Sequence, residues 1–174
     1  MKLADIDPQT LARDTIREAL DHMHRVLFEL APLADYRIVD GGGKPLDASK
    51  LAASNVGHAV TALAAYAQTG APLDAPAQEY CITLIPIAPD ALDDSGSPDP
   101  STPLGLVVSA AIAREDLSQG RGISTTRLAA LGGVSDSRVR QLVVSGDLAV
   151  DKAHDVRPED CLRWLAARGV PGFR

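Results

Sequence analysis

The chain has 174 residues, which is enough for one ordinary domain or two small ones. Hydrophobic residues make up 45% of it and aromatic residues 3%, so Leu, Val, Ile and Ala must form most of any core. This composition favours packed helices over a β-sandwich, because strands prefer aromatic and β-branched side chains. The net charge of −6 argues mildly against nucleic-acid binding by the chain as a whole. We expect a mainly α-helical fold with a few short strands.

The charge is distributed unevenly along the chain. Residues 1–113 hold 7 Lys and Arg against 15 Asp and Glu, whereas residues 114–174 hold 10 against 8. A claim of DNA binding can therefore rest only on residues 114–174. Because the excess of positive charge in this segment is small, its non-specific attraction to phosphates should be weak and salt-sensitive. Cys81 and Cys161 belong to no metal-binding pattern and are expected to be buried thiols in a reducing cytoplasm. We expect no membrane span and no secretory signal.

Two helices are predicted in the N-terminal part. Apolar residues three to five apart predict a long helix from about Pro8 to Leu33, with Asp7 as its N-cap. Such a helix needs a partner surface, which is either the next helix or a second copy of the chain. A second helix is predicted from Ala48 to Thr69. The glycines at 41–43 predict a connector rather than a phosphate loop, because no Gly-Lys-Ser/Thr follows them.

The middle of the chain predicts a strand, a linker and a further helix. Tyr80–Ala88 is a short β-branched run between prolines, as in an edge strand. Residues 103–117 favour a helix that leads into the C-terminal unit. The predicted organisation is a mostly helical domain for dimerisation or partner binding at 1–88, an acidic proline-rich linker at 89–103, and a DNA-binding domain at 104–174.

The most informative segment is Thr125–Val144. It predicts two short helices, Thr125–Leu131 and Asp136–Ser145, joined by a glycine turn at 132–133. Ser124 and Ser135 stand where N-cap residues belong. This arrangement lays a second helix in the DNA major groove. The predicted internal core consists of Leu128, Ala129, Val134, Val139 and Leu142.

The run LAALGGVSDSRVRQLVVSGDL resembles bacterial helix-turn-helix regulators, closest to the winged forms of the excisionase and MerR-like group. The family pattern of apolar, Ala and Gly positions is matched by Leu128, Ala129, Gly133, Val134, Val139 and Leu142. One departure is Gly132, where the family usually has an apolar residue. The resemblance covers about residues 123–168. It implies a two-stranded wing at Leu148–Val156 and a closing helix at Pro158–Arg168, with Trp164 packed in the core.

The exposed face of the second helix is predicted to contact double-stranded DNA. Arg140 and Gln141 point away from the internal core and are expected to read base edges, Arg on guanine and Gln on adenine. Arg138 is expected to bind phosphate. Asp136 does not fit this pattern, because it repels phosphate unless it reads cytosine. Ser135 and Ser137 are expected to contact phosphate oxygens or base edges, and Arg127 and Lys152 are expected to contact the DNA backbone from the first helix and the wing.

The leading hypothesis is a cytoplasmic, sequence-specific transcriptional regulator that acts as a homodimer, because one small module binds DNA weakly. It needs no cofactor and no metal. A second hypothesis is a DNA-recognition or adaptor protein of a mobile element, such as an excision or packaging factor, whose acidic N-terminal part binds another protein. Use of the helix-turn-helix for protein contact stays open. An enzyme is disfavoured, because the histidines at 22, 24, 58 and 154 belong to no catalytic or metal-binding pattern.

Overall fold

The computed structural model describes residues 1–30, 55–84 and 88–173. The predicted glycine connector at 41–43 and the first residues of the predicted helix 48–69 lie outside this part.

The described residues form seven α-helices and two 3₁₀ turns, and their β-structure is limited to isolated bridges. The prediction of a mainly helical fold is confirmed, whereas the predicted short strands are found in the described residues only as isolated bridges. The helices are α1 (Pro8–Leu30), α3 (Asn55–Thr69), α4 (Ala77–Leu84), α5 (Pro103–Ser118), α6 (Thr125–Gly132), α7 (Asp136–Val144) and α8 (Pro158–Ala167), and the turns are η1 (Leu3–Asp5) and η4 (Pro89–Ala91).

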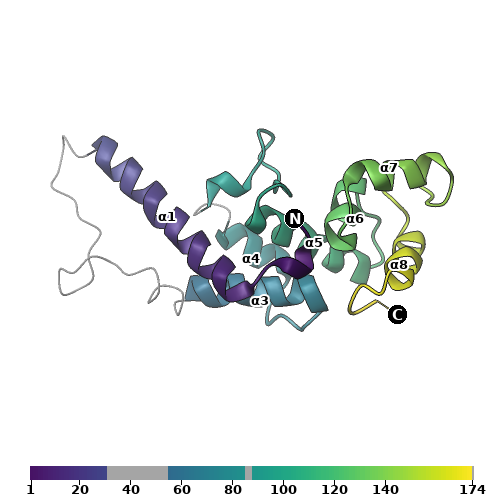
Figure 1. Cartoon of the computed structure of the whole chain (residues 1–174), viewed down its shortest axis with the longest axis horizontal. Helices are drawn as coiled ribbons and strands as arrows, with labels where there is room; N and C mark the ends of the chain where they lie inside the picture. The colour runs from purple at the N-terminus through teal and green to yellow at the C-terminus, as the bar shows by residue number, and fades with distance from the viewer. Residues whose placement is uncertain (31–54, 85–87, 174) are drawn as a thin grey trace.

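Helix α5 is the centre of the molecule. It packs against α3 on one side and against α6 on another, and Figure 1 shows it between the N-terminal helices and the group α6–α8. Its apolar residues occur all around the helix, and Val107, Ala110 and Ala113 are completely buried, as expected of a helix surrounded by others. One connected cluster of buried residues extends from Leu3 to Leu165. The hydrophobic core therefore continues across the predicted boundary between the linker and the C-terminal domain.

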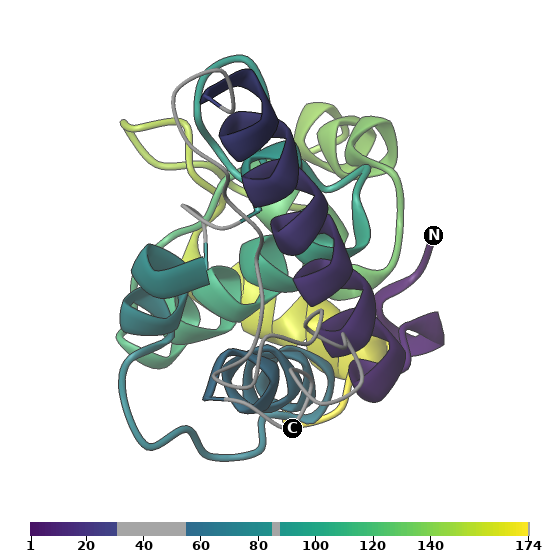
Figure 2. The same ribbon diagram turned by 90° about the vertical axis from the view of Figure 1, so that its left-hand side faces the viewer.

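Helix α1 begins as the sequence predicts. The amide of Thr10 donates to the Asp7 carboxylate at 2.9 Å, and hydrogen bonding to Thr10 lowers the pKa of Asp7. The N-terminal half of α1 buries Leu11 and Ile16 and lies across α3 and α5 on the outside of the molecule (Figure 2). The next helix therefore covers this half of the apolar stripe. The side chains beyond His22 lie outside the described part of the helix.

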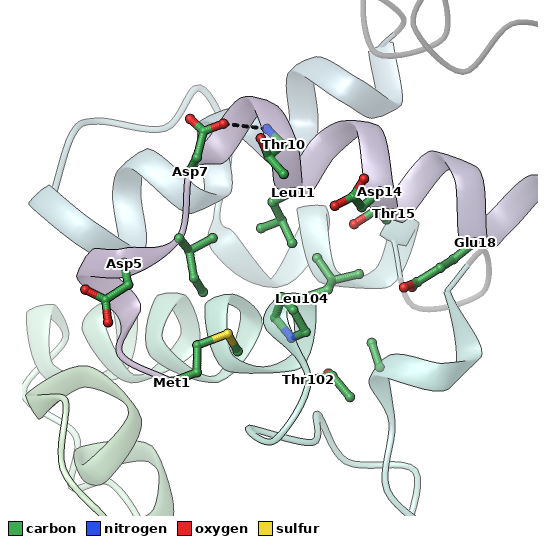
Figure 3. A pocket seen from close by; sticks show the side chains of 13 residues that line it. Met1, Asp5, Asp7, Thr10, Leu11, Asp14, Thr15, Glu18, Thr102 and Leu104 are labelled. Atoms are coloured by element: carbon green, nitrogen blue, oxygen red, sulfur yellow. Dashed lines mark hydrogen bonds between the residues drawn. The ribbon is translucent and has the colours of Figure 1, made fainter.

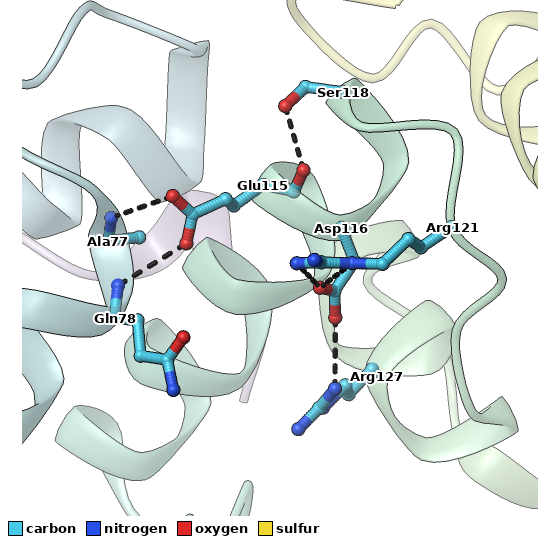
Figure 4. Close-up of polar contacts among 7 residues, drawn as sticks. All are labelled: Ala77, Gln78, Glu115, Asp116, Ser118, Arg121 and Arg127. Carbon is cyan, nitrogen blue, oxygen red and sulfur yellow. Dashed lines mark hydrogen bonds and ion pairs between the residues drawn. The ribbon is translucent and has the colours of Figure 1, made fainter.

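The strand predicted at 80–88 is wrong, because residues 77–84 form helix α4. The Glu115 carboxylate of α5 accepts the amides of Ala77 at 3.2 Å and Gln78 at 3.3 Å, which are donors that a helix leaves without partners (Figure 4). Cys81 and Leu84, on the inner side of α4, are buried in the core. Two tertiary contacts thus favour a helix here over the β-propensity of the segment. One is the capping of α4 by Glu115, and the other is the burial of the face that carries Cys81 and Leu84.

The acidic, proline-rich segment before α5 has its own hydrogen-bonded structure. The amide of Asp99 donates to the Ala91 carbonyl at 2.8 Å, and Ala91 is buried. The Thr102 side chain then caps α5 by accepting the Gly105 amide at 3.1 Å. A Cβ atom at residue 105 would lie 2.1 Å from the Asp99 carbonyl oxygen, so only glycine allows this close approach. The segment is therefore packed onto the start of α5.

Arg114 of α5 contacts both the C-terminal end of α3 and the C-terminal tail of the chain. It is 5% exposed, and its Nη2 donates to the carbonyl of Ala67 at 3.2 Å and to that of Pro171 at 2.9 Å. The guanidinium also lies 4.5 Å from the centre of the Phe173 ring. Burial lowers the pKa of Arg114. One buried cation thus joins the C-terminal end of α3 to the C-terminal tail.

Candidate nucleic-acid interface

The pair α6 and α7 is held by local capping contacts. Ser124 accepts the Arg127 amide and Ser135 accepts the Arg138 amide, both at 3.3 Å, so each helix has a side-chain N-cap. Between the helices, Gly133 has a φ of 66° and donates its amide to the Ala129 carbonyl. A left-handed residue in that place favours glycine. The predicted bounds of both helices are confirmed to within one residue.

The inner side of this pair is closed by α8. Leu128 and Val139 are completely buried, as the helix-turn-helix pattern predicts. A Cβ atom at residue 132 would lie 2.4 Å from Cζ3 of Trp164, so the ring occupies the space that a larger side chain would need. The packing of Trp164 is therefore a physical reason for glycine at residue 132. The predicted packing role of Trp164 is confirmed.

Asp136, which the predicted contacts left without a role, joins the two helices. Its carboxylate accepts the Thr126 hydroxyl of α6 at 3.3 Å and pairs with Nε of Arg140 at 2.6 Å. Arg140 therefore partly neutralises the negative charge at the start of α7. The Arg140 side chain is 67% exposed, so a base that binds it would have to compete with Asp136 for the guanidinium.

The outer face of α7 contains the predicted base-reading residues. Arg140, Gln141 and Ser137 are exposed and line one shallow depression together with Val144 and Ser145. Figure 1 shows α7 at the outer edge of the molecule. Val144, which is 88% exposed, was not among the predicted contacts. Its spacing of three and seven residues from Gln141 and Ser137 places it on their face, and this spacing could have revealed it.

The remaining predicted cations differ in their surroundings. Arg138 is exposed, and its Nη1 donates to the Gln141 side chain at 3.5 Å. Lys152 is exposed and has no ion pair within the part of the chain that the structure describes. Arg127 instead pairs at 3.0 Å with Asp116 of α5, which also binds Arg121 (Figure 4). A phosphate would have to compete with Asp116 for Arg127.

The segment between α7 and α8 is a turn with single bridges in place of the two predicted strands. Val156 is bridged to Val150 and to Ile123, one residue at a time. The Asp151 carboxylate accepts the amides of Ala153 and Asp155 and thereby closes the turn that carries Lys152. On either side of this turn, the Asp151 amide donates to the Asp155 carbonyl at 2.8 Å and the Arg157 amide donates to the Ala149 carbonyl at 2.9 Å.

A separate cavity of about 340 Å³ lies at the start of α1 (Figure 3). Apolar side chains such as Leu11 and Leu104 line it. The charged side chains among its lining residues are all carboxylates, and they are Asp5, Asp7, Asp14 and Glu18. The cavity and the outer face of α7 thus have different chemistry, the first acidic and the second basic and polar.

Comparison with protein-family models, with curated proteins and with solved structures finds no match for this chain. Among the described residues, no group of three or more His, Cys, Asp or Glu side chains is arranged to hold a metal ion. The helices in the described ranges are all too short or too polar to cross a membrane.

Proposed function

We propose that the chain is a sequence-specific DNA-binding regulator that inserts α7 into the major groove. The observation that carries the proposal is the outer face of α7, where exposed Ser137, Arg140 and Gln141 lie together on a short helix with a capped N-terminus. The α6–α7 pair has the size and connection that groove-binding units require. We propose a wing at residues 148–156, with Lys152 on phosphate.

Each residue of this face has a role that follows from its chemistry. Arg140 reads guanine and Gln141 reads adenine, because their side chains match the paired hydrogen-bonding atoms of those bases. Val144, exposed at the end of the same face, suits the methyl group of thymine. Arg138 and Lys152 bind phosphates and set the position of the helix. Ser135 and Ser137 contact phosphate or base edges at the N-terminus of α7.

The regulator is proposed to act as a homodimer on a palindromic site. A single module of this size buries little DNA surface, so two copies are needed for useful affinity. The C-terminal part of α1 extends away from the other helices in Figure 1 and is the place where a second copy would be met.

The experiment that tests the proposal starts by selecting bound duplexes from a random pool with the full chain. Binding of the selected duplex is then measured by fluorescence anisotropy for the wild type and for Arg140→Ala. We expect a loss of about 1–3 kcal/mol in binding free energy and two chains per duplex. Arg163→Ala is a matched control, because Arg163 is also exposed and ion-paired, with Asp160 of its own helix at 2.5 Å.

Equal binding by the wild type and Arg140→Ala would remove Arg140 from the base-reading set. Failure to enrich any duplex would contradict the function itself.

A second candidate, an adaptor protein of a mobile element, is favoured by the acidic cavity beside α1. The carboxylates around its apolar interior suit a basic side chain of a protein partner, which would compete with Arg13 and Arg17 for Asp14. Such a protein would still bind DNA through α7. The two functions are distinguished by the genomic position of the selected sites, because a regulator binds at promoters and an adaptor binds at recombination or packaging sites.

A further inference from the structure

A second cavity, of about 420 Å³, lies directly behind the turn between α6 and α7. Four segments that are far apart in the sequence form it: the N-terminal residues 2–4, the end of α3 at 68–69, the turn at 131–133 and the C-terminal residues 168–171. Its volume is within the range of small-molecule sites, which are often formed where separate parts of a chain meet.

The charge of this cavity is opposite to that of the chain. Its charged lining residues among those described are Lys2 and Arg168, and no carboxylate lines it, although the net charge of the chain is −6. Within the described residues, the Lys2 side chain has no hydrogen bond or ion pair. A concave site lined by cations raises the local concentration of anions.

Arg168 is held in a defined direction. Its Nε donates to the Gly132 carbonyl at 3.3 Å, and its guanidinium lies 5.0 Å from the centre of the Trp164 ring. These two contacts leave the terminal nitrogens of the guanidinium for another acceptor. A guanidinium held in this way suits a carboxylate or sulfonate, which it can bind with two parallel hydrogen bonds.

We propose that this cavity binds a small organic anion that has one carboxylate or sulfonate group on an apolar body. Arg168 and Lys2 bind the acidic group. The apolar body lies against Leu3, Val170 and Pro171, which line the same cavity.

A ligand in this place acts on the α6–α7 turn. Arg168 donates to the carbonyl of Gly132, and the Trp164 ring packs on that same glycine. An anion bound to the terminal nitrogens of Arg168 is therefore one residue away from the contacts that hold the turn, and its binding is coupled to them through the same guanidinium. An effect of the ligand on DNA affinity rests on the proposed function, but the binding of the anion does not.

Trp164, the only tryptophan of the chain, does not line the cavity but contacts two residues that do, Gly132 and Arg168, so its fluorescence should respond to a ligand bound there. The test titrates the full chain with 8-anilino-1-naphthalenesulfonate and, separately, with 1-naphthylmethylamine, a cation with a similar ring system. Calorimetry of the same titrations gives the dissociation constants without relying on Trp164. We expect saturable quenching by the sulfonate and no saturable binding of the amine.

The variants locate the site. We expect Arg168→Gln to weaken sulfonate binding about tenfold, because a charge-assisted hydrogen bond is lost. We expect Lys2→Gln to weaken it in the same direction, and this variant removes a charge from an exposed residue outside the helices. Arg163→Gln, on the same helix as Trp164 but not at the cavity, should bind like the wild type.

Unchanged sulfonate affinity in both Arg168→Gln and Lys2→Gln would overturn the proposal, as would equal binding of the amine. These titrations contain no DNA. Failure of the anion site can therefore be distinguished from failure of the proposed DNA-binding function.

Discussion

Helices α4 and α7 have similar lengths, of 8 and 9 residues, but their N-termini obtain hydrogen-bond partners in different ways. The first amides of α4 donate to Glu115, which lies 37 and 38 residues away in the sequence. The amide of Arg138 in α7 donates to Ser135, three residues before it. The start of α4 thus depends on α5, whereas the starts of α6 and α7 are determined by their own sequence.

Helix α5 is shared by both regions, and this sharing has a thermodynamic consequence. The buried cluster includes Leu63 of α3 and Leu128 of α6, with α5 between them. Arg114 adds hydrogen bonds from α5 to the end of α3 and to the C-terminal tail. Unfolding of the N-terminal helices should therefore remove support from the C-terminal ones. The predictions below test how far the two regions are independent.

The largest expected effect comes from Leu63→Ala in α3. Leu63 is completely buried, so its truncation should cost about 2–5 kcal/mol of unfolding free energy. Thermal unfolding is followed by far-ultraviolet circular dichroism, which reports all helices, and by the fluorescence of Trp164. We expect both probes to shift together. A shift confined to circular dichroism would show that the C-terminal helices fold separately from α3.

Gly132→Ala tests the packing of α8 on the α6–α7 turn. The added Cβ would lie 2.4 Å from the Trp164 ring, so the ring must move, at a cost of about 1–3 kcal/mol. Gly133→Ala is a useful comparison, because nothing lies within 4 Å of its Cβ and its cost comes from the φ of 66° alone. We expect Gly132→Ala, but not Gly133→Ala, to change the emission spectrum of Trp164. Identical spectra for the two variants would contradict the packing of Trp164 on Gly132.

The smallest expected effects concern the two caps. Ser135→Ala and Glu115→Gln should each cost about 1 kcal/mol, because each weakens acceptors for backbone amides. Their local effects should differ: hydrogen exchange should accelerate at the start of α4 in Glu115→Gln and at the start of α7 in Ser135→Ala. Exchange is measured residue by residue by nuclear magnetic resonance. Unchanged exchange of Ala77 and Gln78 in Glu115→Gln would contradict capping over this distance.

The difference between the local caps of α6 and α7 and the long-range cap of α4 explains what could be predicted from the sequence. Ser124, Gly133 and Ser135 act on residues a few positions away, so the bounds of α6 and α7 followed from the sequence. The contact of Glu115 with the start of α4 depends on how α5 packs, and no local pattern reveals it. The segment 80–88 was therefore predicted as a strand from its β-branched residues alone.

The candidate site was predictable in part for the same reason. The exposure of Arg140 and Gln141 follows from helical periodicity, and Val144 could have been found in the same way. The pairing of Arg127 with Asp116 requires knowledge of how α5 and α6 lie, whereas the pairing of Arg140 with Asp136, four residues apart on α7, follows from helical spacing and could have been predicted. The cavity behind the turn combines four distant segments, so the sequence could not show it.

The most direct measurement of the central claim is a titration of the isotope-labelled full chain with a selected duplex, followed in amide nuclear magnetic resonance spectra. We expect the largest shifts at Ser137, Arg138, Gln141 and Val144, and at Lys152 in the turn, with small shifts in α1 and α3. A duplex that shifts the amides beside the acidic cavity and leaves those of α7 unchanged would contradict DNA recognition by this helix.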